Sequence, residues 1–171
     1  MHGRTAMIGE VIKLVLENVP AITFVAAIAV AFARRQPDLP AALLNWLLLL
    51  AVGVDALWAG VFHTLFPQIA AGSIGWRPNP FQYEVGVADI AMGAIAVAAF
   101  WRPLPFKAAV VGYVTLFYLG VTIGHVREAV VAGNFSPNNF GLLLALTVAK
   151  MILLPALYLK VRNRERLVGP A

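Results

Sequence analysis

Residues 72–93 read GSIGWRPNPFQYEVGVADIAMG, and this stretch joins a loop rich in residues that stop and start helices to an apolar segment that carries two carboxylates. Asn79 and Pro80 are typical of a helix N-cap and first helical position. Gln82 stands at the third position, where its side chain can reach back to the cap. We therefore predict a helix that starts near Pro80 and takes both carboxylates into the apolar segment.

The composition indicates an integral membrane protein. Hydrophobic residues make up 61% of the 171 residues, charged residues only 12%, and the mean hydropathy is +0.82, far above the value for a soluble domain. A helix needs about 20 mostly apolar residues to cross a bilayer, and five segments meet this requirement. We predict an all-α fold, an integral membrane bundle of about five transmembrane helices forming a single membrane domain over residues 1–171. The predicted spans are residues 8–33, 41–66, 80–101, 108–131 and 137–159, with a basic tail over residues 160–171.

The net charge of +5 is explained by membrane topology and does not indicate nucleic acid as a partner. Eight basic residues fall on one predicted side of the membrane: Arg34, Arg35, Arg102, Lys107, Lys160, Arg162, Arg164 and Arg166. Four fall on the other side: Arg4, Lys13, Arg77 and Arg127. Cytoplasmic connections carry the excess of Lys and Arg, so the N-terminus is predicted outside and the C-terminus in the cytoplasm. The sequence has no cysteine, which excludes disulfides and thiolate metal ligands.

Polar and small residues recur at helical spacing within the spans, at steps of three or four that place them on one face. The stripes on the second, third and fourth spans are Asp55, Ala59 and His63; Gln82, Gly86, Asp89 and Gly93; and Thr115, Tyr118, Thr122, His125 and Glu128. We expect these faces to turn toward other helices rather than toward lipid. Glu84 lies off its stripe, about 140° from Asp89 at 100° per residue.

The helical rise of about 1.5 Å per residue sorts the ionisable residues into two layers. The outer layer holds His63, Glu84, His125 and Glu128. The layer near the middle of the membrane holds Asp55, Asp89 and Lys150. An unpaired charge there costs at least about 2.5 to 3.5 kcal/mol, so we predict that Asp55 and Lys150 form a buried ion pair. Asp89 and Tyr118 are predicted to form the floor of a pocket lined by the outer layer.

Three stretches resemble a family of small bacterial multi-pass membrane proteins known only as a domain of unknown function. They are FHTLFPQIA, IGWRPNPFQYEVGVADIAMG and LGVTIGHVREAVVAGNFSPNNFG. The family's pattern of Gly-Trp, Pro-Phe-Gln-x-Glu-x-Gly and Gly-His followed by Asn-x-x-Pro-x-Asn is similar to Gly75-Trp76, residues 80–86, Gly124-His125 and the block that begins at Asn134. The resemblance covers residues 62–155. It implies a multi-pass protein of the bacterial inner (cytoplasmic) membrane and a site at Glu84 and His125, but no activity.

Several functions are compatible with the outer layer. A His and a Glu three residues apart on one helix, with a Glu from a neighbouring helix, are the building block of di-metal sites in bundles. His63, Glu84, His125 and Glu128 are therefore candidate ligands of a transition metal, with zinc, iron, manganese or copper(II) favoured because soft ligands are absent. Haem is disfavoured, since the bundle would have to open a wide slot. A small-ligand pocket, a proton or ion pathway and a purely structural hydrogen-bonded cluster stay open.

Enzymatic activity is not indicated by any local motif. The sequence lacks HExxH, a Gly-rich phosphate loop and a serine or cysteine nucleophile beside a histidine. A lipid-modifying enzyme that uses His and Glu as acid and base stays open, but a non-enzymatic role is favoured. A homo-oligomer or a non-catalytic subunit of a larger membrane complex is equally compatible, and the lipid bilayer is the expected partner.

Overall fold

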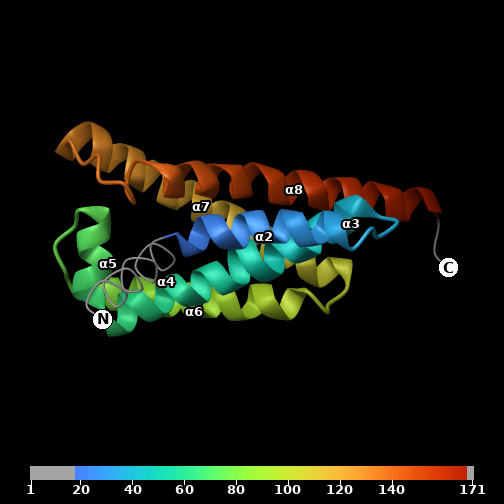
Figure 1. The fold of residues 1–171 in the computed structure, drawn as a ribbon, viewed down its shortest axis with the longest axis horizontal. Coiled ribbons are helices and arrows are strands. Elements are labelled where there is room, and N and C mark those ends of the chain that lie inside the picture. The colour runs from blue at the N-terminus through green and yellow to red at the C-terminus, as the bar shows by residue number, and fades with distance from the viewer. Residues whose placement is uncertain (1–17, 169–171) are drawn as a thin grey trace, which may run out of the picture.

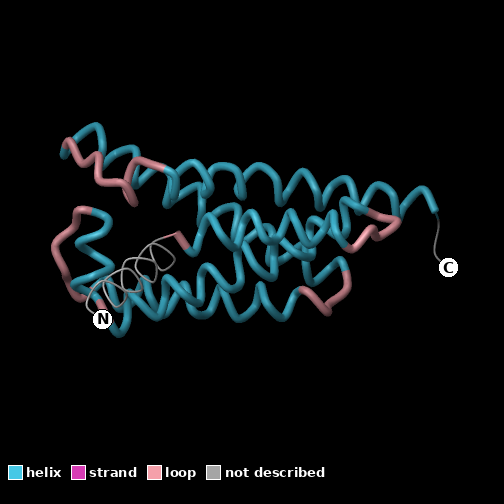
Figure 2. The backbone as a smooth tube through the Cα atoms, in the orientation of Figure 1, coloured by secondary structure: helices cyan, strands magenta, loops and turns pink. Residues whose placement is uncertain are grey.

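The computed structural model describes residues 18–168, and each element within this range is helical (Figures 1 and 2). In chain order the elements are α2 Val19–Ala33, α3 Leu39–Trp46, the π-helix η1 Leu47–Val54, α4 Asp55–Leu65, α5 Pro67–Ile74, α6 Phe81–Ala99, α7 Leu104–Ala132 and α8 Leu142–Val168. The predicted all-α class is confirmed for the described residues.

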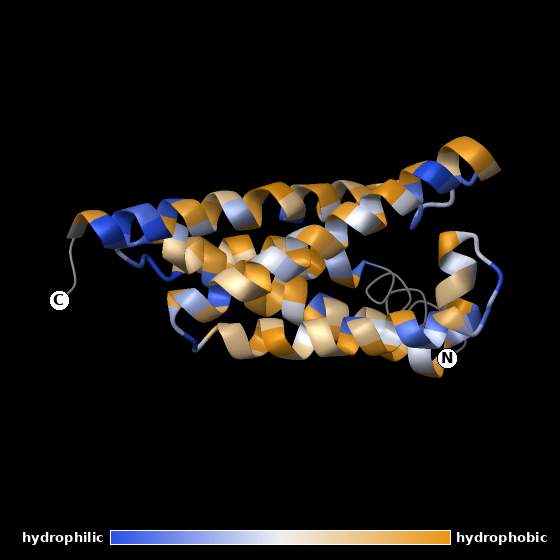
Figure 3. Ribbon diagram, turned by 180° about the vertical axis from the view of Figure 1, so that it is seen from behind, coloured by the Kyte–Doolittle hydropathy of each residue, from blue (hydrophilic) through white to orange (hydrophobic). Residues whose placement is uncertain are grey.

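Four of the described helical segments are long and apolar enough to cross a membrane: Leu39–Leu65, Phe81–Ala99, Leu104–Ala132 and Leu142–Leu167. The apolar helix α2 is shorter, with 15 residues. The predicted first span of residues 8–33 would need residues 8–17, which lie outside the described range. Hydrophobic residues predominate along most of the length of the helices (Figure 3). On α7, for example, Leu116, Ile123 and Val130 are exposed, as expected where a helix faces lipid.

The second span is one continuous helix with a π-helical middle. It begins after Asp38, whose carboxylate accepts a hydrogen bond from the Ala41 N–H at 3.2 Å, and it therefore starts slightly before the predicted residue 41. In the π segment the backbone N–H of Asp55 bonds to the carbonyl of Leu50, five residues back, rather than to that of Ala51. This widened turn leaves the Ala51 carbonyl available to another donor, which proves to be Lys150.

Small residues allow the second span and α6 to pack closely and antiparallel. A Cβ placed on Gly60 would lie 2.7 Å from the Gly86 carbonyl oxygen, and one placed on Gly93 would lie 2.8 Å from the Gly53 carbonyl oxygen. These two backbone contacts are seven residues apart on each helix, so the register is maintained over two turns. The predicted stripe of Gln82, Gly86, Asp89 and Gly93 is buried, as the helical spacing indicates.

The predicted spans 41–66 and 80–101 leave residues 67–79 as a connecting loop, but this segment contains α5. Pro67 occupies the first turn of this helix, and Gly75 ends it with a φ of 78°, a left-handed conformation that glycine adopts without strain. The cap of α6 also differs from its prediction. Asn79 Oδ1 does accept a hydrogen bond from the Phe81 N–H at 3.0 Å. Gln82 does not reach back to the cap, because its Nε2 donates to the Pro67 carbonyl at 2.7 Å and so ties α6 to α5.

The last two helices differ from the predicted spans at their ends. α7 begins at Leu104 instead of residue 108, since Pro103 is extended and the proline of the next turn is tolerated there. α8 begins at Leu142 instead of residue 137, so Ser136-Pro137 is not its cap. The Ser136 carbonyl instead accepts hydrogen bonds from the Asn139 and Phe140 N–H groups in a turn before the helix. α8 then continues to Val168, through most of the predicted basic tail.

The described connections lie at two opposite ends of the bundle (Figure 1). One end holds residues 34–38, residues 100–103 and the C-terminal turns of α8, and there Arg164 pairs with Asp38 at 3.1 Å. The other end holds α5, the start of α6 and residues 133–141. The predicted grouping of basic connections thus corresponds to a physical asymmetry between the two ends of the described bundle.

Candidate functional site

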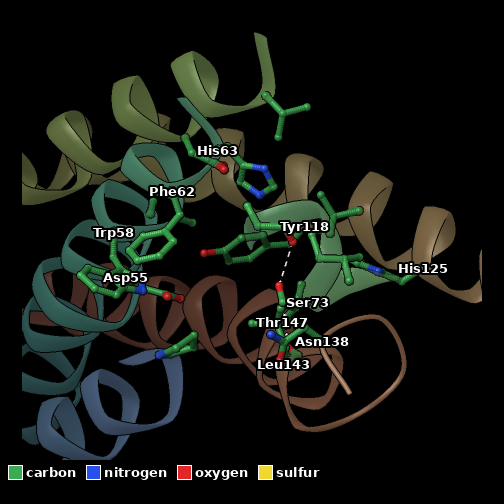
Figure 4. Close-up of a pocket in the computed structure, with 18 of the residues that line it drawn as sticks. Asp55, Trp58, Phe62, His63, Ser73, Tyr118, His125, Asn138, Leu143 and Thr147 are labelled. Atoms are coloured by element: carbon green, nitrogen blue, oxygen red, sulfur yellow. Dashed lines mark hydrogen bonds between the residues drawn. The ribbon is translucent and has the colours of Figure 1, made fainter. Parts of the chain in front are cut away.

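A cavity of about 760 Å³ lies mainly between α4, α5 and α6 on one side and α7 and α8 on the other (Figure 4). Its walls are largely apolar, and six aromatic side chains of residues 18–168 line it: Trp58, Phe62, Phe66, Trp76, Phe117 and Tyr118. Sites for small molecules typically have about this volume, with apolar and aromatic walls and a few converging polar groups. The size and wall chemistry of the cavity are therefore those of a small-molecule site.

A cluster of buried polar side chains lines part of this cavity, and we call Asp55, Asp89, Tyr118 and Lys150 the charged cluster. Lys150 Nζ donates to Asp55 Oδ2 at 2.7 Å, with side chains only 3% and 9% exposed. It also donates to the carbonyl of Ala51 at 3.2 Å and lies 4.8 Å from the centre of the Tyr118 ring. This is the pairing that the mid-membrane positions of Asp55 and Lys150 predict, and the π-helical turn supplies a second acceptor.

Asp89 differs from the rest of the charged cluster because its carboxylate has no hydrogen bond or ion pair within residues 18–168. The residue is 7% exposed. It is close enough to Asp55 and Lys150 to interact electrostatically with both, but Lys150 donates to the other carboxylate. A buried carboxylate without a partner is costly. No described residue supplies Asp89 with a hydrogen-bond donor or a counter-ion.

His63 brings a second unpartnered polar atom to the cavity. It lies two turns beyond Asp55 on α4, and Figure 4 shows Asp55, Phe62 and His63 along this wall with Tyr118 across from them. Its Nδ1 is buried and has no hydrogen-bond partner in the described residues. The wall formed by α4 and α6 thus presents an imidazole nitrogen and a carboxylate that have no hydrogen-bond partner within residues 18–168.

His125 lies at the same cavity but is held by the chain itself. Asn139 is fully buried, and its Nδ2 donates to the carbonyl of Asn134 at 2.7 Å. That bond fixes the orientation of the amide, so His125 Nδ1 donates to Asn139 Oδ1 at 2.6 Å. The imidazole also stacks on Trp76, with ring centres 6.1 Å apart. Asn134 Nδ2 donates to the carbonyl of Ile74 at 2.9 Å, and this network, the Asn139 cluster, joins the end of α5 to the loop before α8.

The model of a family of unknown function, DUF6790, matches residues 17–167 of the chain. The protein belongs to the DUF6790 family. The match is wider than the resemblance over residues 62–155 and takes in α2 and nearly all of α8. No curated protein and no solved structure matches the chain.

In this DUF6790 protein the four predicted metal ligands do not come together. His63 and His125 line the cavity, whereas Glu84 and Glu128 do not. Glu84 is exposed, because the buried stripe of α6 faces the second span and Glu84 lies on another side of the helix. Glu128 lies on α7 one turn past His125, near the end of the helix at Ala132. Within the described residues no group of three His, Asp or Glu side chains could hold a metal ion.

The two predicted floor residues, Asp89 and Tyr118, line the cavity. Other residues of its lining were not predicted from the sequence. Its aromatic wall and the wall formed by α5 were missed, because aromatic residues in an apolar span give no polar signal. The DUF6790 chain did hold a usable indication of α5, since Pro67 and Gly75 stand where proline and glycine start and end short helices.

Proposed function

We propose that this DUF6790 protein binds a small, largely apolar molecule inside a membrane-embedded helical bundle. The observation that carries the proposal is the aromatic-walled cavity of about 760 Å³, which has polar groups on only part of its lining. The cavity lies among helices long and apolar enough to cross a membrane, so the molecule would be taken from the bilayer or retained within it.

Selectivity would come from shape and from the polar groups. A molecule that leaves lipid for an apolar cavity gains little from the hydrophobic effect, since lipid tails are as apolar as the cavity wall. Hydrogen bonds and charges are stronger in such surroundings. The unpartnered groups of Asp89 and His63 would therefore decide which molecule binds, and the ion pair of Lys150 with Asp55 would hold the wall that presents them.

The proposal includes a location. With the basic connections in the cytoplasm, α5 and the Asn139 cluster lie at the outer end of the bundle, and the cavity lies in its outer half. The bacterial cytoplasmic membrane is the location that we propose. Supporting this orientation, the exposed arginines of residues 34–38 and of the C-terminal turns of α8 share one end.

The test uses two glycines of α7 that differ in one respect. Neither would bring a Cβ within 4 Å of another atom, but Gly124 lines the cavity and Gly120 does not. The purified protein in a non-ionic detergent is titrated with the neutral fluorescent probe N-phenyl-1-naphthylamine. We expect Gly124→Phe to weaken binding by about tenfold or more, as overpacking of a filled site does, and Gly120→Phe to leave it unchanged.

The same samples identify the natural ligand. Molecules extracted from the purified protein are analysed by mass spectrometry, and a species retained by the wild type and by Gly120→Phe but lost from Gly124→Phe is the candidate. If neither this probe nor a charged apolar probe binds, or if the two variants behave alike, the cavity is not a ligand site and the proposal is wrong.

A further inference from the structure

The negative and positive charges of the side chains that line the cavity are unequal in number. Among residues 18–168 the charged side chains are Asp55, Asp89 and Lys150, so two described carboxylates face one ammonium group. The ammonium is already committed to Asp55 at 2.7 Å. Neither cavity histidine pairs with Asp89 in the described structure, since the His125 ring bonds to Asn139 and the His63 Nδ1 has no partner. The described part of the lining therefore carries one negative charge without a counter-charge.

That excess charge lies where water cannot easily compensate it. Asp89 is 7% exposed on a helix apolar enough to cross a membrane, and the remaining opening is toward the cavity that it lines. A carboxylate in such surroundings is stabilised by a positive charge beside it or by protonation. A cation bound in the cavity would satisfy Asp89 without any rearrangement of the Lys150 pair.

The walls suit a cation with an apolar body. Aromatic faces attract cations through their negative quadrupole, most strongly where the cation is desolvated. Six aromatic side chains line this cavity, and the chain's own Lys150 already lies over the face of Tyr118. An anion would instead meet the free carboxylate of Asp89, with the one lysine of the lining already paired.

We propose that the ligand is a lipophilic organic cation whose charged group lies beside Asp89 and whose apolar body packs against the aromatic walls. This inference rests on the proposed function and specifies the chemical class of the molecule. It goes beyond that function by assigning Asp89 as the residue that selects for charge.

The first experiment compares three probes on the wild-type protein in a non-ionic detergent, with empty micelles as the blank. Tetraphenylphosphonium and tetraphenylborate have nearly the same size and shape but opposite charge, and N-phenyl-1-naphthylamine is neutral. We expect tetraphenylphosphonium to bind at least about tenfold more tightly than tetraphenylborate. This comparison needs no variant, so it does not depend on how a mutant folds.

The second experiment uses two carboxylates of α6. Asp89→Asn removes the charge in the cavity with little change of shape, and Glu84→Gln removes an exposed charge outside it. We expect Asp89→Asn to weaken tetraphenylphosphonium binding by about 30-fold or more, the range for loss of one partner of a buried charge pair. Glu84→Gln should leave it unchanged.

The outcomes separate the two proposals. Equal binding of the two tetraphenyl ions, or an Asp89→Asn variant that binds the cation as tightly as the wild type, overturns the inference. If the neutral probe binds but the cation does not, the inference is wrong and the proposed function stands. If none of the three probes binds, both are wrong.

Discussion

At the scale of single residues, the buried ion pair between Asp55 and Lys150 links α8 to the second span. Each group is nearly inaccessible to solvent and would be strongly disfavoured in apolar surroundings without the other. The π-helical turn before Asp55 adds the Ala51 carbonyl as a second acceptor for Lys150. Lys150 is thus satisfied by two elements of the same span, and α8 is fixed against the second span at this depth.

Removal of Lys150 alone should be more harmful than removal of the pair. Lys150→Met leaves the Asp55 carboxylate buried without a partner, and we expect a loss of about 3–5 kcal/mol in the free energy of unfolding. The double variant with Asp55→Leu should recover most of this loss, because it strands no charge. Unfolding in mixed micelles measures the difference, and Lys160→Met on the exposed surface of α8 is the control. Equal losses, or a less stable double variant, would show that the two residues are not energetic partners.

The sequence predicted residue contacts correctly where an unpaired charge inside the membrane would be too costly. Asp55 and Lys150 could be paired from it because each needs a counter-charge and both fall at mid-membrane. Depth did not show that Glu84 and Glu128 fail to line the cavity, although the angle of about 140° between Glu84 and Asp89 already separated Glu84 from its stripe. Depth along the span does not fix the rotation of a helix about its axis, and the packing of α6 on the second span turns Glu84 outward. Glu128 lies near the end of α7, where a carboxylate can reach water. It therefore needs no partner inside the bundle, and its position could not be predicted from the cost of burial.

At the scale of elements, close packing of α4 on α6 positions the wall that carries His63 and Asp89. The contact depends on small residues, because the Gly60 Cα lies against the backbone of Gly86. Without this close approach the stripe of Asp89 could not be buried beside the second span. The burial of Asp89 thus depends on two glycines, Gly60 and Gly86, each of which stands three residues before a polar residue of the wall.

Two glycine substitutions separate packing from helix propensity. Gly60→Ala would place a Cβ 2.7 Å from the Gly86 carbonyl oxygen, whereas Gly112→Ala on α7 meets nothing within 4 Å. We expect Gly60→Ala to destabilise the protein by about 1–3 kcal/mol through overpacking. Gly112→Ala should be neutral or stabilising by up to about 1 kcal/mol, since alanine favours helix. Unfolding in mixed micelles tests both. A Gly60→Ala variant as stable as the wild type would mean that the helices do not pack this closely.

Helices were predictable where apolar length defines them and less so at their ends. Four segments predicted as spans correspond to long described helices, but α8 begins at Leu142 and not at Pro137. The buried Asn139 holds the preceding turn through two hydrogen bonds. One is to His125 on α7, 14 residues earlier, and the other is to the carbonyl of Asn134 in the loop. The π-helical segment has no signature in the sequence LLLLAVGV, which would serve equally well as α-helix. Tertiary contacts, absent from local patterns, decide such features.

At the scale of the whole molecule, the bundle has two chemically different ends. Arg34, Arg35, Arg102 and the basic residues of the last turns of α8 share one end, while the described residues of the other end include Arg77 and Arg127. The cavity and the Asn139 cluster lie toward this second end. Orientation in the membrane therefore determines from which side the cavity would be reached.

We predict that the end carrying Arg34 and Arg35 is cytoplasmic, because positively charged connections are retained on that side. Fusions to green fluorescent protein and to alkaline phosphatase, made after Arg35, after Trp76 and at Ala171, test the orientation in a bacterial host. We expect fluorescence without phosphatase activity at Arg35 and Ala171, and the reverse at Trp76. This prediction assumes one crossing by each candidate span, which makes the signals alternate. Phosphatase activity at Ala171 would contradict the orientation, and equal signals at Arg35 and Trp76 would contradict a crossing by Leu39–Leu65.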